Sequence, residues 1–250
     1  AIGSGAFPMG LLQEIFGLKE RIAYDLGYKV WSPATVKENI IQKSIYGVDI
    51  ERGAVDIARL RFWLSLIVDE EMPKALPNLD YKIVVGNSLV SKFDDTVIEI
   101  DWDRKGSVGE ADKHVKGVQI ALKSISEKQK HFFESKSNKQ KQKLKAEIRD
   151  LKLDVLINQL SFNKASYLNK NQKVSDMGFG LKATDHKKNL EIDLQVAEFD
   201  QALAKLQRLK ENPDLDFNHF DWKLDFPEVL NPLVNEITGF DIVIGNPPYI

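Results

Sequence analysis

The 250-residue chain contains no cysteine, and its four histidines lack the spacing of metal ligands. Disulfide bonds, thiolate metal sites and cysteine nucleophiles are therefore excluded, and we expect no metal. No stretch approaches the roughly 20 consecutive apolar residues of a membrane span. The first residues also lack the basic start and apolar core of a secretory signal. We therefore expect a cytoplasmic protein without a membrane partner.

A net positive charge is also absent, because the formal net charge is −2. The bases are nevertheless concentrated, with twelve Lys or Arg against four Asp or Glu from Lys113 to Lys152. Such a stretch is either the solvated face of a long helix or a surface for the phosphates of DNA. We favour the solvated face, because the basic side chains are spread along the segment without an aromatic platform.

The amino-terminal part alternates helix and strand patterns. Apolar spacing predicts a helix over Met9–Leu18, a strand over Ser44–Val48 and a second helix over Ala54–Val68. A second strand is predicted over Tyr81–Val85. Strand, helix and strand in this order are typical of a parallel sheet. The apolar face of the second helix is predicted to carry Ile57, Leu60, Leu64 and Ile67.

The middle of the chain, from about Glu110 to Leu209, is rich in Lys, Gln and Glu and has few prolines. This composition with helical periodicity predicts an antiparallel pair of helices, Ile120–Leu160 and Leu190–Leu209. A polar loop over Asn163–Asn189 is predicted to join them.

Sheet character returns near the end of the chain. The segment Phe217–Phe226 is aromatic and acidic, and the apolar run Phe240–Ile244 predicts a buried strand. We therefore predict an α/β fold, a doubly wound Rossmann-like domain with a long helical insertion between its third and fourth strands. The expected division is a first core half at residues 1–109, a helical insertion at 110–213 and a return to the core at 214–250.

The sequence Asn246-Pro247-Pro248-Tyr249 follows the last predicted strand directly. Two prolines fix φ at successive residues and remove two amide donors, and the residue before each proline is pushed towards extended conformations. A stiff loop at the carboxyl end of a buried strand projects its polar groups into the crevice where α/β sheets bind ligands. The alternative is a simple strand-ending turn, since Asn and Pro are common turn residues.

From Phe240 to Tyr249, the sequence FDIVIGNPPY resembles the catalytic motif of amino-directed DNA methyltransferases, which modify N6 of adenine. The resemblance implies that the target adenine is flipped out of the duplex and that Tyr249 stacks on it. It also implies that the Asn246 side-chain oxygen and the Pro247 carbonyl accept hydrogen bonds from the amine. Two such acceptors concentrate the nitrogen lone pair and stabilise the positive charge that develops there. Pro248 completes the rigid corner, and this chemistry requires no metal.

The amino-terminal sequence AIGSGAF resembles the cofactor loop of the same family. Two closely spaced glycines permit a tight turn and a close approach of the backbone to a ligand, and a helix is predicted to start directly after them. Neither GxGxxG nor GK[ST] is present, which disfavours nicotinamide cofactors and P-loop nucleotides. The resemblance implies S-adenosylmethionine as the cofactor, with the loop residues Ala1, Gly3, Ser4, Gly5 and Phe7 at its site.

Two further polar residues follow predicted strands. Asp49 is placed to accept hydrogen bonds from ribose hydroxyls, and a role as acidic N-cap of the next helix is compatible with that. The resemblance assigns it the ribose, with Ile50 flanking the cofactor adenine. In the sequence Gly86-Asn87-Ser88-Leu89, the resemblance implies that Asn87 hydrogen-bonds the cofactor adenine and that Leu89 packs on its face. The alternative for this sequence, including Ser88, is a helix cap or a turn.

The segments Phe217–Leu230 (FNHFDWKLDFPEVL) and Arg52–Leu66 resemble the subfamily of large, fused restriction–modification methyltransferases. This resemblance implies an adenine-specific enzyme acting on double-stranded DNA, with its target-recognition domain after the catalytic motif. The family's usual first strand and that recognition domain lie outside this sequence, so we expect a fragment that is inactive in isolation. The alternatives are a non-catalytic module that binds DNA or a subunit, and related methylation at cytosine N4 or on RNA or protein amides.

Overall fold

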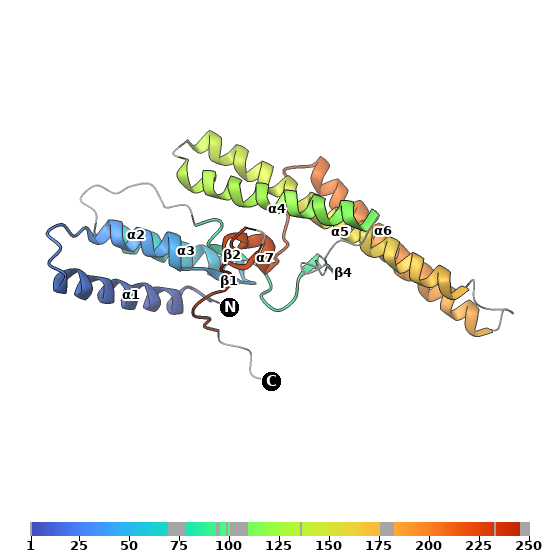
Figure 1. The fold of residues 1–250 in the computed structure, drawn as a ribbon, viewed down its shortest axis with the longest axis horizontal. Helices are drawn as coiled ribbons and strands as arrows, with labels where there is room; N and C mark the ends of the chain where they lie inside the picture. The colour runs from blue at the N-terminus through green and yellow to red at the C-terminus, as the bar shows by residue number, and fades with distance from the viewer. Residues whose placement is uncertain are drawn as a thin grey trace. The chain divides into compact units, whose positions relative to one another are not determined.

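The computed structural model describes residues 2–69, 79–93, 96–98, 100, 110–135, 137–175, 183–232 and 234–245. The chain is divided into two compact units. We call them the core unit (Ala1–Val90, Phe220–Leu230 and Thr238–Ile250) and the helical unit (Ser91–His219 and Asn231–Ile237). Figure 1 shows the helices and strands of both.

The core unit is built on a parallel pair of strands. β1 (Gly47–Asp49) and β2 (Ile83–Val85) pair with Val48 opposite Val84, and α3 (Arg52–Ile67) is the crossover that a parallel pair requires. This arrangement confirms the predicted order of strand, helix and strand. The described residues of this unit contain this one pair, so a larger doubly wound sheet stays a prediction. The remaining helices of the unit are α1 (Ala6–Asp25), α2 (Pro33–Ser44), α7 (Trp222–Asp225) and α8 (Pro227–Leu230).

The helix α1 contains the predicted Met9–Leu18 segment and is longer at both ends. The helix α2 was not predicted, although its start carries a recognisable signal. Pro33 occupies the first turn, and the Ser32 side chain accepts a hydrogen bond from the Thr35 amide at 3.5 Å. A serine cap before a proline is a typical helix start.

The apolar face that the sequence predicted for α3 is not the face that is buried. The helix spans the predicted region, but Ile57, Leu60 and Leu64 are each close to half exposed. The opposite face is buried instead and consists of Val55, Ala58, Phe62 and Leu66. Both faces carry apolar residues at helical spacing, so periodicity alone does not identify the inner one.

Both faces of the β1–β2 pair are covered. One side packs against a cluster drawn from the helices, including Leu12 of α1, Ile41 of α2 and Phe62 of α3. On the other side, Val48 and Val84 pack against a cluster that includes Phe220 and Phe226. Successive side chains of a strand point to opposite faces, and here each face has its own apolar cover.

Between Phe217 and Gly245, the described residues near the end of the chain lack the predicted sheet character. Within Phe217–Phe226 the structure has a short helix, α7, because the Asp221 side chain accepts hydrogen bonds from the amides of Lys223 and Leu224, both at 3.0 Å. The predicted buried strand Phe240–Ile244 is also wrong, since these residues form no strand and Ile242 to Ile244 are at least half exposed. A strand needs a neighbour for its backbone hydrogen bonds, and no described strand pairs with this segment.

Where the structure describes the helical unit, it contains three long helices rather than the predicted two. They are α4 (Glu110–Glu134), α5 (Asn138–Ser175) and α6 (Ala183–Glu211), and α5 packs against both of the others. The unpredicted break between α4 and α5 is serine-rich: the Ser137 amide donates to the Ser135 hydroxyl at 3.3 Å, a local bond that competes with helix. A short antiparallel ladder joins β3 (Lys92–Phe93) and β4 (Thr96–Val97).

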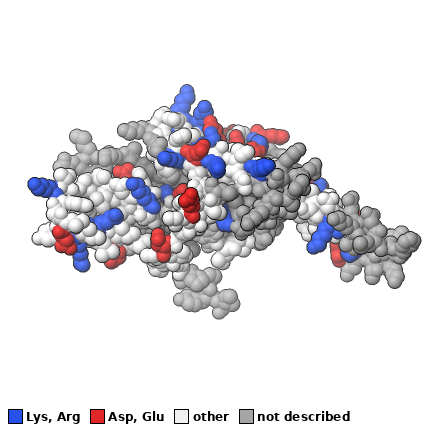
Figure 2. All heavy atoms as spheres, in the orientation of Figure 1, with Lys and Arg blue, Asp and Glu red and all other residues white. Residues whose placement is uncertain are grey.

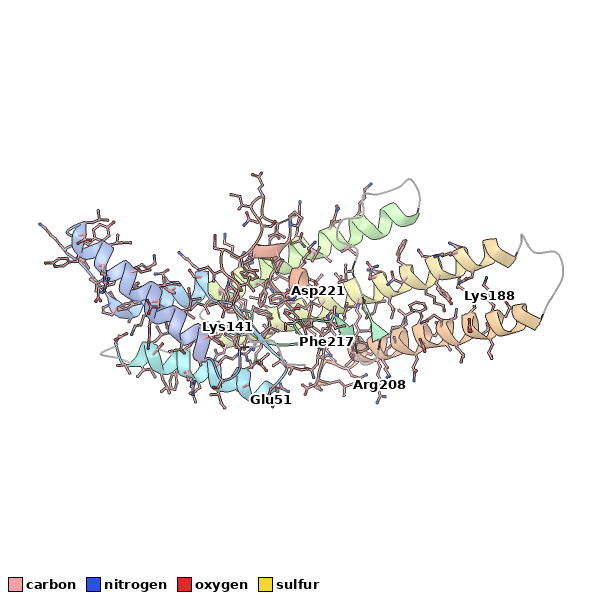
Figure 3. The ribbon with its side chains drawn as sticks, turned by 90° about the horizontal axis from the view of Figure 1, so that it is seen from below. Glu51, Lys141, Lys188, Arg208, Phe217 and Asp221 are labelled. Atoms are coloured by element: carbon pink, nitrogen blue, oxygen red, sulfur yellow. The ribbon has the colours of Figure 1, made fainter. Side chains whose placement is uncertain are left out.

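The predicted loop Asn163–Asn189 is largely helical. The helix α5 continues to Ser175 and α6 begins at Ala183, while residues 176–182 lie outside the described part. Figures 1 and 3 show α5 and α6 running side by side, and the ion pair of Lys164 with Asp200 at 2.5 Å links them. Of the helices that the structure describes, none is long and apolar enough to cross a membrane.

Candidate functional site

The carboxyl ends of β1 and β2 bring two of the predicted site segments together. The strands are parallel, so Asp49 at the end of β1 lies opposite Val85 at the end of β2. The Gly86 amide then donates to the Asp49 carbonyl at 2.8 Å. The segments that begin at Ile50 and at Asn87 therefore leave the same edge of the sheet, where open α/β sheets bind ligands.

The glycine-rich turn lies against this edge. The Ile2 amide donates to the Val48 carbonyl at 3.1 Å. Gly3 and Gly5 have φ of 54° and 93°, values that side chains disfavour. A Cβ at Gly5 would lie 3.0 Å from Cβ of Ala58. Glycine at position 5 is therefore required twice, for its backbone conformation and for the close approach of α3.

The Asp49 carboxylate ties the turn to the strand. Its Oδ2 accepts from the Gly3 amide at 2.8 Å and its Oδ1 accepts from the Glu51 amide at 3.0 Å. The residue is buried. The N-cap of α3 is Glu51, whose side chain accepts from the Gly53 amide. Asp49 is thus not the cap of that helix, and each carboxylate oxygen keeps a second lone pair for a hydroxyl donor.

Large apolar side chains at this edge are exposed. The exposed fractions are 51% for Phe7, 70% for Ile50 and 82% for Leu89. The Asn87 Oδ1 accepts from the amides of Leu89 and Val90 at 2.9 and 3.2 Å, so the predicted turn is present. Among the described residues, none accepts from the Asn87 amide nitrogen, which leaves a donor available beside exposed apolar surface.

Two aromatic residues that the sequence did not assign to the site support the Asn87 turn. A Cβ at Gly86 would lie 2.2 Å from Cβ of Phe220, so glycine is needed there for the phenylalanine to pack. The Trp222 Nε1 donates to the Ser88 carbonyl at 2.9 Å. The aromatic run before the catalytic motif was noticed in the sequence, but nothing in the sequence indicates which turn it contacts.

A buried polar cluster fastens α8 to the strands. Lys82 is buried, and its Nζ donates to the Tyr46 hydroxyl at 2.6 Å and to Glu228 Oε1 at 3.0 Å. The same Nζ lies 4.0 Å from the Tyr46 ring centroid. Burial lowers the pKa of Lys82, while the Glu228 charge opposes that effect. Burial, and then the charge of Glu228, raise the pKa of Tyr46. These groups are held inside the fold.

The predicted catalytic residues Asn246, Pro247, Pro248 and Tyr249 lie outside the described residues, as does Ala1. The segment leading to them is described as far as Gly245. It is attached to the core unit at Phe240, whose ring centroid lies 5.3 Å from Tyr46 and 6.3 Å from Phe226. Ser4 is half-buried within the glycine turn.

A separate cavity opens between α1 and α2. Its volume is about 530 Å³, and it is lined by residues that include Ile22, Trp31 and Asn39. None of the predicted cofactor residues lines it. The described residues also contain no group of three or more His, Asp or Glu side chains that could hold a metal ion. His219 instead pairs with the Ser91 hydroxyl at 3.0 Å.

Comparison with known proteins relates the chain to a family and to a relative. A family model described as Eco57I restriction-modification methylase matches residues 43–250. A protein of Methanocaldococcus jannaschii, named as a candidate type II restriction enzyme and methyltransferase, is 30% identical over 274 residues, covering 100% of this chain. The chain spans 21% of that relative's length. No solved structure matches.

Proposed function

Because the chain belongs to the Eco57I restriction-modification methylase family, we propose that it transfers the methyl group of S-adenosylmethionine to N6 of adenine in double-stranded DNA. The observation that carries this proposal is the joining of the glycine turn to the carboxyl edge of the strands through Asp49. Gly3 and Asp49 are 46 residues apart in sequence and share a hydrogen bond of 2.8 Å. A dinucleotide fold or a P-loop would require glycine patterns that the sequence lacks.

The described residues fit S-adenosylmethionine. Asp49 retains lone pairs for the ribose hydroxyls, and Asn87 retains its amide donor for the adenine. Ile50 and Leu89 expose most of their apolar surface, which an aromatic base would remove from water. Gly3, Ser4 and Gly5 bring the backbone close to the remainder of the cofactor, with Phe7 beside them. When bound, the cofactor supplies an electrophilic methyl group on a sulfonium.

The proposed catalytic residues act on the target base. The Asn246 side-chain oxygen and the Pro247 carbonyl accept hydrogen bonds from the two amine N–H groups of a flipped adenine, and Tyr249 stacks on the base. The adenine amine is a weak nucleophile because its lone pair is delocalised into the ring. Fixed acceptors restore its nucleophilicity and stabilise the positive charge that forms on nitrogen. Pro247 and Pro248 supply the rigidity that keeps these acceptors fixed.

We also propose the context in which this chemistry occurs. The chain acts inside a restriction–modification system in the cytoplasm, with a target-recognition domain of the same protein following the catalytic motif. The proposed division is a core half at 1–109, an insertion at 110–213 and a return at 214–250. The helices α4, α5 and α6 fall within the middle range.

The first prediction tests this function with Asn246→Ala in the full-length protein. We expect transfer of a labelled methyl group to adenine to fall by at least about two orders of magnitude, the effect typical of removing one fixed charge-stabilising group. The dissociation constant for S-adenosylmethionine should stay within about twofold, since Asn246 contacts the target and not the cofactor. The base product should be identified by nucleoside analysis.

Three outcomes would contradict the proposal in different ways. Retained activity in Asn246→Ala removes the catalytic assignment. A methylated cytosine as the product replaces adenine by cytosine as the target. A wild-type protein that binds DNA but not S-adenosylmethionine indicates a non-catalytic module.

A further inference from the structure

Trp222 makes one hydrogen bond that crosses a long stretch of sequence. Its Nε1 donates to the Ser88 carbonyl at 2.9 Å, across 134 residues. Ser88 lies between Asn87 and Leu89 in the turn that ends β2, which is the turn proposed above to hold the cofactor adenine. A fixed Ser88 carbonyl fixes the planar peptide unit that joins Ser88 to Leu89. The indole therefore restrains the residues that flank the proposed adenine site.

The same indole contacts the segment that leads to the proposed catalytic corner. The ring centroids of Trp222 and Phe240 are 6.2 Å apart with an interplanar angle of 74°, an edge-to-face arrangement that is favourable for aromatic pairs. Phe240 starts the stretch that runs to Asn246. One side chain thus contacts both the cofactor side and the catalytic side of the core unit.

The position of Trp222 is itself fixed from several directions. Asp221 caps α7, and its own amide donates to Asp225 Oδ2 at 3.0 Å. Phe220 packs against Gly86, and Phe226 is fully buried beneath the Tyr46 ring at a centroid distance of 5.1 Å. These contacts leave α7 little freedom to rotate. Figure 3 marks Asp221 at the start of this helix.

Filling the core is not the main role of this tryptophan. Trp222 is 37% exposed, whereas its neighbours Leu224 and Phe226 are fully buried. Apolar burial stabilises in proportion to the area removed from water, so a partly exposed indole contributes less than a buried one. Trp222 differs from these buried neighbours by its indole N–H hydrogen bond and by its contact with Phe240.

We propose that Trp222 is a positioning residue that couples the cofactor turn Gly86–Leu89 to the catalytic segment that begins at Phe240. This inference rests on the proposed function. The indole N–H holds the turn in the geometry that accepts adenine. The indole ring keeps Phe240, the first residue of the segment that leads to the catalytic motif, in register with that turn. The two contacts have separable consequences, one for cofactor binding and one for turnover.

The test uses Trp222→Phe and Trp222→Leu in the full-length protein, with Trp31→Phe as the matched control. Trp31 belongs to the same unit and packs on a phenylalanine, Phe16, at 5.8 Å. Its Nε1 is buried and has no hydrogen-bond partner among the residues that the structure describes. The control therefore makes the same chemical change beside the same kind of ring, but removes no hydrogen bond.

Trp222→Phe keeps a ring against Phe240 and loses only the donor. We expect its dissociation constant for S-adenosylmethionine to rise about three- to tenfold, the factor that one hydrogen bond contributes, with kcat at saturating cofactor within about twofold. Trp222→Leu loses the hydrogen bond and the ring contacts with Phe240, Phe220 and Phe226, and its kcat should also fall by about tenfold or more through misplacement of the catalytic segment. Trp31→Phe should match the wild type in both quantities.

A purely structural role predicts a different result. If Trp222→Phe and Trp31→Phe lower the melting temperature but bind the cofactor as tightly as the wild type, the proposal is wrong. It is also wrong if both variants weaken cofactor binding equally, or if Trp222→Leu retains the wild-type kcat. Failure of the proposed function is recognised separately, because the wild-type protein would then show no cofactor binding or methyl transfer at all.

Discussion

The core unit and the helical unit are each stabilised internally, and the kind of internal contact differs between them. In the core unit, positions depend on single close approaches, such as Gly86 beneath Phe220 and Gly5 against Ala58. In the helical unit, α4, α5 and α6 pack through an apolar seam, with Lys164–Asp200 and Lys210–Asp154 as partly exposed ion pairs across it. Many apolar residues of similar size can form such a seam. A close backbone approach admits glycine alone.

The distribution of charged side chains supports the same contrast. On the face shown in Figure 2, the Lys and Arg side chains are interspersed with Asp and Glu. Exposed ion pairs of this kind contribute little to stability, so their individual residues are replaceable. The buried carboxylate of Asp49, by contrast, accepts two amides from different segments. Residue identity should therefore matter more in the core unit, and three predictions test that contrast.

The largest expected effect comes from one pair of glycine substitutions. A Cβ at Gly86 would meet Phe220 at 2.2 Å, whereas a Cβ at Gly117 of α4 has nothing within 4 Å. Gly86→Ala should destabilise the core unit by about 3 kcal/mol through overpacking. Gly117→Ala should stabilise α4 by roughly 0.5–1 kcal/mol, because alanine favours helix over glycine. Urea unfolding monitored separately for each unit measures both.

The contrast between the units is wrong if Gly86→Ala and Gly117→Ala change the free energy of unfolding by the same amount. Equal stability of Gly86→Ala and the wild type would mean that Phe220 does not pack on the turn. Loss of stability in Gly117→Ala would mean that α4 is as tightly constrained as the core unit.

The sequence predicted features that depend on local patterns and missed features that depend on contacts between distant residues. The order of strand, helix and strand was confirmed because apolar periodicity is a local property. Periodicity grouped Ile57, Leu60 and Leu64 on one face of α3 but did not identify the buried face, because that face is set by tertiary contacts such as that of Ala58 with Gly5, which a sequence does not state. The break at Ser135 was missed, since serine is also tolerated within helices.

The candidate site shows a similar limit. The proximity of the glycine turn to Asp49 was expected from the resemblance, and the structure brings them together. The roles of Phe220 and Trp222 were not predicted, because the partner turn lies more than 130 residues away along the chain. The strand over Phe240–Ile244 was predicted from its apolar run, but a strand also needs a neighbour that composition does not supply.

The next prediction compares a buried lysine with a partly exposed one. Lys82→Met should destabilise the core unit by about 1–2 kcal/mol, because it removes hydrogen bonds to Tyr46 and to the carboxylate of Glu228. Lys164→Met removes the partly exposed pair with Asp200 and should cost less than about 1 kcal/mol. Unfolding midpoints at pH 7 give both values.

The pH dependence of Lys82 sharpens this test. Burial lowers the pKa of Lys82 below its ordinary 10.5, so the unfolded chain binds the proton more tightly. The stability of the wild type should therefore rise with pH as pH passes from the lowered pKa towards 10.5. Above about pH 10 the raised pKa of Tyr46 acts in the opposite direction. The rise should be missing in Lys82→Met, and an equal rise in both proteins would contradict the assignment.

The smallest effect is expected in the basic stretch of the helical unit. Lys123, Lys130, Lys139 and Lys141 have no ion-pair partner among the described residues. Nearby bases are paired, as Lys128 and Lys143 are with Glu147. If these lysines form a solvated face, changing all four to glutamine should leave the salt dependence of DNA binding by the full-length protein almost unchanged.

If these lysines instead contact DNA phosphates, the expected change in the salt dependence of binding can be calculated. Each phosphate contact that is lost reduces the slope of log K against log salt by about 0.9, so four lost contacts would reduce it by roughly 3.6. A control that replaces Lys19, Lys29, Lys170 and Lys188 removes the same charge from elsewhere and corrects for the general field of the protein. A reduction confined to the first variant would show that the helical unit contacts DNA. The identities of its basic residues would then be constrained by DNA binding, whereas the residue identities in the core unit are constrained by the packing of the fold.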